Sequence, residues 1–312
     1  MRNECYWKGY QKFWDEFVKN WFAKRCVGEV PSDEVSQAFK MCVNGLEFDE
    51  LPEPYYGAPY NDSTVKAVVI NLNPGISAAV EGQKYYKEKD TYRGKGPFVK
   101  RSLIKEFEIS CNQRYSEFVE NWSCLKSEFR VRNTDLCGVK WWQGVDPQKN
   151  GGKRLAWLSR IYQDVELKPE AVFALECCPY HSFGFSFNHR DVKSTSILQK
   201  FIKEKVIIPA ATAVAENKLP FAVAVGKTIA DILDSVVGES SKEWSYNSPS
   251  GWSKDLPKRT YKLYEVHISN DRIVPIIVTW AVNNRGVPAP GKVFGSIEKD
   301  IYDYCKDKFQ NA

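Results

Sequence analysis

The chain has 312 residues, of which 43% are hydrophobic and 14% aromatic, enough to bury a sizeable globular core. Its formal net charge is +5, from 44 basic and 39 acidic residues, which permits a polyanionic partner without requiring one. No apolar run reaches the length of a membrane-spanning helix, so we expect no membrane partner.

The cysteines and histidines argue against a disulfide framework and against a metal site. The nine cysteines are odd in number and no apolar leader precedes them, so we expect reduced thiols in a cytoplasmic protein. No Cys-x-x-Cys pair occurs, and only three histidines are present. The sequence therefore predicts no metal.

The first 62 residues predict a helical extension packed on the core. Aromatic residues recur at helical spacing over residues 4–25, with charged residues between them. Ser32, Asp33 and Glu34 are typical of the start of a second helix, which ends near Cys42. Residues 46–62 contain three prolines and several turn residues, so we expect a surface connection there.

Residues 63–312 predict one α/β domain with an irregular insertion over residues 76–165. Four apolar, β-branched runs favour buried strands, and the segments between them favour helices. This alternation predicts a three-layer α/β/α sandwich with a mostly parallel, four-stranded central sheet. The expected strands lie at 65–72, 171–176, 221–226 and 273–280, with an edge strand at 261–268. The expected helices lie at 98–107, 154–163, 194–205, 207–217, 227–236 and 294–309. Residues 238–258 are expected to form a loop.

The first of these strands leads directly into Asn73-Pro74-Gly75. Pro and Gly force a turn at the carboxyl end of the strand. Because ligands bind outside the carboxyl ends of strands in open α/β sheets, Asn73 is well placed to hold a water or a substrate. The alternative is an ordinary turn between a strand and a helix.

Other candidate chemistries are weaker. Gly226-Lys227-Thr228 lacks the preceding glycine that a phosphate-binding loop requires, and no Gly-x-Ser-x-Gly elbow occurs. Cys177 or Cys178 could act as a nucleophile beside a histidine, but a cysteine that ends a buried strand more often belongs to the core.

Three short motifs follow one another along the domain. Asn73-Pro74-Gly75 ends the first strand, Gly96-Pro97-Phe98 follows in a loop, and Glu176-Cys177-Cys178-Pro179 ends the second strand. In this order and strand context, the sequence resembles the uracil-DNA glycosylase superfamily, especially its single-strand-selective monofunctional and mismatch-specific branches. The resemblance extends over about residues 65–300 and leaves out the N-terminal helices.

The resemblance implies a monofunctional DNA glycosylase, which flips a nucleotide out of the DNA and hydrolyses its N-glycosidic bond. Asn73, fixed by Pro74 and Gly75, would hold the attacking water, and Phe98 would stack on the flipped base. No metal or organic cofactor is implied. We expect DNA as the partner and a monomeric protein.

Glu176 stands where the family has an asparagine that reads uracil. An ionised glutamate only accepts hydrogen bonds, so it would repel O4 of uracil and suit the exocyclic amine of cytosine. A protonated glutamate, favoured by burial, could instead donate to a ring nitrogen or carbonyl. Since a genome cannot tolerate the loss of ordinary cytosine, we expect a modified cytosine-type base, such as those of some phage genomes, and a role in anti-phage defence. The alternative is that Glu176 pairs with a nearby Lys or Arg and contacts no base.

The end of the last strand departs from the family, which has His-Pro-Ser or Asn-Pro-Ser there. Asn283 or Asn284 would support the leaving base, and His181 is an alternative residue of the base pocket. The loop from Arg285 to Lys292 would enter the duplex, with apolar residues as its wedge. Basic side chains are the expected phosphate contacts, with a solvated surface as the alternative; they are Lys95, Lys100, Arg101, Lys105, Lys149, Lys153, Arg154, Arg285 and Lys292.

Two other functions stay open on the same residues. One is a catalytically silent nucleic-acid-binding protein, because the motif after the last strand is degraded. The other is a hydrolase that acts on nucleosides or their phosphates.

Overall fold

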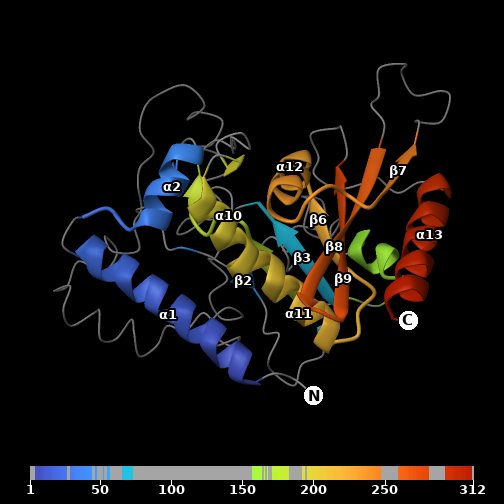
Figure 1. The fold of residues 1–312 in the computed structure, drawn as a ribbon, viewed down its shortest axis with the longest axis horizontal. Helices are drawn as coiled ribbons and strands as arrows, with labels where there is room; N and C mark the ends of the chain where they lie inside the picture. Colours follow the sequence, from blue (N-terminus) through green and yellow to red (C-terminus); the bar gives the residue numbers. More distant parts are fainter. Residues whose placement is uncertain are drawn as a thin grey trace, which may run out of the picture.

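The described part of the chain has an α/β fold in which helices pack against one mixed sheet (Figure 1). The computed structural model describes residues 4–26, 29–43, 46–47, 52, 55–56, 65–72, 157–163, 165, 167, 171–182, 192–193, 195–246, 259–280 and 292–310. Within these ranges, no helix combines the length and the apolar content needed to cross a membrane.

The sheet contains seven strands in the order β2-β4-β3-β6-β9-β8-β7. Four of them lie side by side and parallel at its centre, β4 (Val172–Glu176), β3 (Ala67–Asn71), β6 (Ala222–Val225) and β9 (Arg272–Trp280). They are the four strands that the apolar runs predict, so this prediction is confirmed. Every residue of β3 and β4 is buried, as expected of parallel strands covered on both faces.

The predicted four-stranded sheet is wrong in size, because three further strands join it in antiparallel pairing. The predicted edge strand, β8 (Arg259–Ser269), pairs with β9, and β7 (Lys242–Tyr246) pairs with the outer side of β8. β7 falls in the predicted loop because its charged and aromatic residues form no apolar run. On the opposite edge, β2 (Tyr55–Tyr56) pairs with β4 inside the predicted surface connection, where Tyr55 is fully buried.

The observed helices match the predicted helices more closely than the observed sheet matches the predicted one. α1 (Glu4–Cys26), α2 (Glu34–Cys42), α12 (Lys227–Val236) and α13 (Lys292–Phe309) confirm four predicted helices. Asp33 caps α2, since its carboxylate accepts the backbone N–H of Ser36 at 2.9 Å.

The two helices predicted at 194–205 and 207–217 form one continuous rod, so the predicted break between them is wrong. α10 (Ser196–Ile202) continues through a π-helical turn, η2 (Lys203–Ile207), into α11 (Ile208–Glu216). Pro209 lies in the first turn of α11, where its missing N–H is accommodated after the wider π turn. The proline therefore does not end the helix.

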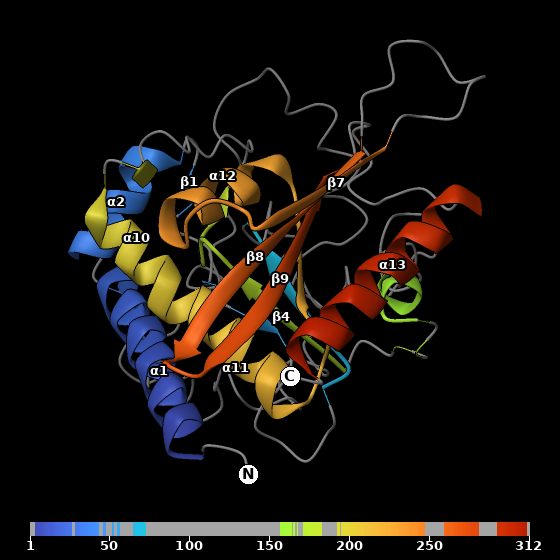
Figure 2. The ribbon, with the colours of Figure 1, turned by 45° about the vertical axis from the view of Figure 1, so that its right-hand side comes forward.

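Different helices cover the two faces of the sheet. Tyr261 and Tyr264 are three residues apart on β8, so their side chains point to opposite faces. The Tyr264 hydroxyl donates to the carbonyl of Ala230 in α12 at 3.2 Å, whereas the Tyr261 hydroxyl donates to Glu298 of α13 at 3.2 Å. We call these the α12 face and the α13 face, and Figure 2 shows the two helices on opposite sides of the strands.

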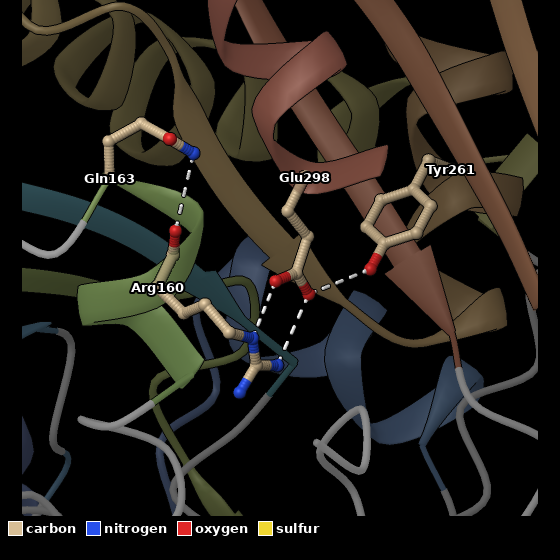
Figure 3. Close-up of polar contacts among 4 residues, drawn as sticks. All are labelled: Arg160, Gln163, Tyr261 and Glu298. Atoms are coloured by element: carbon tan, nitrogen blue, oxygen red, sulfur yellow. Dashed lines mark hydrogen bonds and ion pairs between the residues drawn. The ribbon is translucent and has the colours of Figure 1, made fainter. Parts of the chain in front are cut away.

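A buried ion pair fastens α13 to the helical turn at 157–161, which lies within the predicted helix 154–163. The fully buried Glu298 carboxylate accepts from Nε of Arg160 at 2.6 Å and from its Nη2 at 3.2 Å (Figure 3). Together with the Tyr261 contact, this carboxylate joins three segments that lie far apart in the sequence. The Gln163 amide donates to the Arg160 carbonyl at 3.5 Å and closes the same turn.

α1 packs through aromatic rings on the side of the sheet opposite to α13. The ring of Trp7 lies 6.0 Å from that of Phe173 in β4, and the ring of Trp14 lies 5.8 Å from that of Phe201 in α10, both edge-on. Phe173 and Glu176 are three residues apart on β4, so α1 covers the face away from Glu176.

Candidate active site

Polar side chains form one row across the carboxyl ends of the parallel strands. Glu176 pairs with Asn71, and Thr279 of β9 pairs with Val225 of β6, which follows β3 in the sheet. Residues at the same level of neighbouring strands point to the same face. The row continues from Thr279 to Tyr261, so its side chains point to the α13 face.

This row lies at a topological switch point. The chain leaves β3 for β4 on one side and leaves β6 for β9 on the other. In open α/β sheets, the crevice outside the carboxyl ends at such a point is where ligands bind. Gly226 follows β6 with a φ of 129°, which favours glycine, and its N–H donates to the Thr279 carbonyl at 2.9 Å as the chain turns into α12.

A hydrogen bond between buried groups joins the first two polar side chains of the row. Nδ2 of Asn71 donates to Oε1 of Glu176 at 3.0 Å, and the two residues are only 8% and 2% exposed. Burying a carboxyl group costs free energy unless it is hydrogen-bonded, so the amide offsets part of this cost. The pair can present acceptor oxygens to an amine or a ring N–H of a bound ligand.

The turn after β4 is held against the end of β3. The backbone N–H groups of Cys177 and Cys178 donate to the carbonyls of Asn71 and Leu72, each at 2.9 Å. Both thiols are fully buried. Burial raises the pKa of each thiol well above its usual range, and the charge of Glu176 adds to this. A buried, protonated thiol is a poor nucleophile, which argues against the cysteine alternative.

Thr279 carries the third polar side chain of the row, and we expect Thr279→Val to raise the free energy of unfolding by about 1 kcal/mol. Its Oγ1 is buried and no described residue hydrogen-bonds to it. Valine has the same shape and removes the unmade hydrogen bond. Urea denaturation followed by circular dichroism measures the change. The matched control, Val278→Thr, buries a new hydroxyl one residue away and should lower stability by about 1–3 kcal/mol. A loss of stability in Thr279→Val would contradict this expectation.

Three of the predicted site residues lie in the described ranges. Glu176 ends β4 in the polar row, whereas His181 begins β5 (His181–Ser182), which pairs with β1 (Leu46–Glu47) in a separate two-stranded sheet. Lys292 is the first residue of α13. The other predicted site residues lie outside the described residues, and so do two further predicted phosphate contacts, Lys105 and Lys149. These other site residues are Asn73, Pro74, Gly75, Lys95, Phe98, Lys100, Arg101, Lys153, Arg154, Asn283, Asn284 and Arg285.

Asn71 and Thr279 belong to this site but not to the predicted site residues, and Asn71 is the one that hydrogen-bonds to Glu176. A signal for it exists, because it closes the apolar run of β3 as Glu176 closes the run of β4. Polar residues at equivalent ends of two parallel strands are expected to meet at one edge of the sheet.

Within the described ranges, no group of three or more His, Cys, Asp or Glu side chains is placed to hold a metal ion. Comparisons with protein-family models, with curated proteins and with solved structures matched the chain to none of them. The chemistry of the strand ends therefore carries the functional argument.

Proposed function

We propose that this protein is a monofunctional DNA glycosylase that removes a modified, cytosine-type base, on a three-layer α/β/α fold like that of the uracil-DNA glycosylases. The observation that carries the proposal is the buried Glu176, held by Asn71 at a strand end. The neighbouring strand leads within two residues into Asn73-Pro74-Gly75. The carboxyl group that reads the base in this proposal therefore belongs to the strand next to the one that continues, in sequence, into the proposed water-holding motif.

In this proposal Glu176 is a carboxylate, which can accept from the Asn71 amide and from an amine of the base together. An amide N–H donates only to a lone pair, so Oε1 of Glu176 acts as an acceptor. A carboxylate in this role accepts from the exocyclic amine of cytosine. It would face the acceptor O4 of uracil unfavourably.

In the proposed reaction, the target nucleotide flips out of the stack and the base enters the site. Asn73 holds a water whose oxygen bonds to C1′ as the glycosidic bond breaks. The base leaves with the bonding electron pair and takes up the proton that the attacking water loses. Phe98 stacks on the base, and Asn283 or Asn284 supports its departing charge. These roles come from the family resemblance. The proposed partner is DNA in the cytoplasm, and the proposed setting is defence against phages with modified cytosine.

Glu176→Gln is expected to lower the rate of release of a modified cytosine by about 10–100-fold, because one acceptor is replaced by an amide donor. The assay follows base release from oligonucleotides that carry uracil, cytosine, 5-methylcytosine, 5-hydroxymethylcytosine or glucosylated 5-hydroxymethylcytosine. The wild-type protein should release a modified cytosine and little uracil. An unchanged preference in Glu176→Gln would favour a structural pairing of Glu176 with Lys or Arg.

The control variant is Asn73→Ala, which should lose turnover but retain DNA binding that weakens steeply with salt. Release of uracil alone would contradict the cytosine proposal. DNA binding without base release by the wild-type protein would indicate a silent binding protein. Hydrolysis of free nucleosides, without activity on DNA, would indicate a nucleoside hydrolase.

A further inference from the structure

The sheet itself presets the contact between Asn71 and Glu176. The two residues pair in register at the ends of β3 and β4. The backbone N–H of Cys177 donates to the Asn71 carbonyl at 2.9 Å and continues this pairing by one residue. Strand pairing thereby places the two side chains within reach of each other, and Nδ2 lies 3.0 Å from Oε1.

We infer that Asn71 is a positioning residue for Glu176 and that the two side chains together, rather than Glu176 alone, determine which base is accepted; this inference rests on the proposed function. A glutamate side chain has three rotatable torsions, so its carboxylate can meet a ligand from several directions. The hydrogen bond from the Asn71 amide holds Oε1 and so limits the orientations that the carboxylate can take. A planar base edge is read only when the reading group is held in the matching orientation.

The pair also lies apart from the aromatic packing that stabilises the other side of the sheet. Phe173, which contacts α1, points to the face opposite to Glu176. A change at Asn71 can therefore be compared with a change on the α12 face that costs a hydrogen bond without touching the site. Tyr264→Phe is such a control, since the Tyr264 hydroxyl hydrogen-bonds to two residues of α12, Ala230 at 3.2 Å and Asp234 at 2.8 Å.

Asn71→Leu keeps the approximate shape of the side chain and removes its N–H. The substrate is the modified-cytosine oligonucleotide from which the wild-type protein releases the base fastest. On it, we expect kcat to fall about 10–100-fold, with KM changed less than about threefold. Adding Glu176→Gln to Asn71→Leu should cause little further loss, because the two side chains act as one unit. Tyr264→Phe should lose stability but keep kcat.

Asn71→Asp tests the same inference through a pH profile. It places two carboxyl groups about 3 Å apart, and such a pair shares a proton at low pH. The shared proton restores a donor toward Glu176, so the activity of Asn71→Asp relative to wild type should rise as the pH falls from 8 to 5.5. A residue that only stabilises the strand end would not produce this pH response. The measurement uses one folded protein and so stands even if Asn71→Leu does not fold.

Two failures are distinguishable in this experiment. A wild-type protein that releases no base from any oligonucleotide overturns the proposed function and this inference with it. An active wild-type protein, together with a kcat within threefold in folded Asn71→Leu or a flat pH ratio in Asn71→Asp, overturns the positioning role alone.

Discussion

Arg160→Met is expected to lower the free energy of unfolding by about 3–5 kcal/mol. The substitution leaves the Glu298 carboxylate fully buried, with the Tyr261 hydroxyl as its remaining contact in Figure 3. A buried charge that loses its partner cannot be solvated in the folded state, so the unfolded state becomes relatively more favourable. Urea denaturation monitored by circular dichroism measures the loss.

The other half of the pair supplies the matched control. Glu298→Gln leaves the Arg160 side chain, which is 24% exposed and reaches water, so the expected loss is smaller, about 1–3 kcal/mol. The double variant Arg160→Met, Glu298→Leu removes both charges and should recover most of the stability lost in Arg160→Met. Equal losses in the two single variants that simply add in the double variant would contradict this account.

Trp14→Ala should lower the free energy of unfolding by about 3–5 kcal/mol, because it opens a cavity where α1 meets α10. Trp14 is fully buried, with the rings of Phe13, Phe17 and Phe201 at 5.0, 5.2 and 5.8 Å. Urea denaturation measures the loss, and limited proteolysis should show earlier cleavage within α1.

Trp14→Phe is the control, since a smaller ring keeps most of the packing. It also removes an indole N–H that is buried without a hydrogen-bond partner among the described residues. We expect a loss below about 2 kcal/mol. Similar losses in Trp14→Phe and Trp14→Ala would contradict cavity formation as the cause.

Local patterns predict the elements that have a strong periodic signal. The four parallel strands are short β-branched runs, and α1 repeats its aromatic residues at helical spacing, so both follow from sequence. β7 was missed because its five residues, two charged, two aromatic and one serine, form no apolar run, and its pairing with β8 is a tertiary effect. The continuity of α10 through η2 was missed because a proline usually predicts a break.

The candidate site also contains features that local sequence patterns predict and features that depend on tertiary pairing. That Glu176 ends a buried strand could be predicted, because the apolar run and the Pro-bearing turn are adjacent in the sequence. The position of Asn71 at the end of the next buried strand also had a signal in the sequence, but its hydrogen bond to Glu176 depends on the register between strands, which local sequence does not give. The ion pair of Arg160 with Glu298 was missed for the same reason, as 138 positions separate its partners.

The pairing of β3 with β4 also affects how the protein is made. Asn71 and Glu176 are 105 positions apart and meet only after the intervening chain has closed a long loop. Parallel pairing of this kind forms slowly, because the loss of chain entropy precedes the contacts that offset it. A growing polypeptide that has emerged only as far as β3 contains Asn71 but not yet Glu176. The contact between these two side chains should therefore form late in biosynthesis, when β4 has been made and has paired with β3.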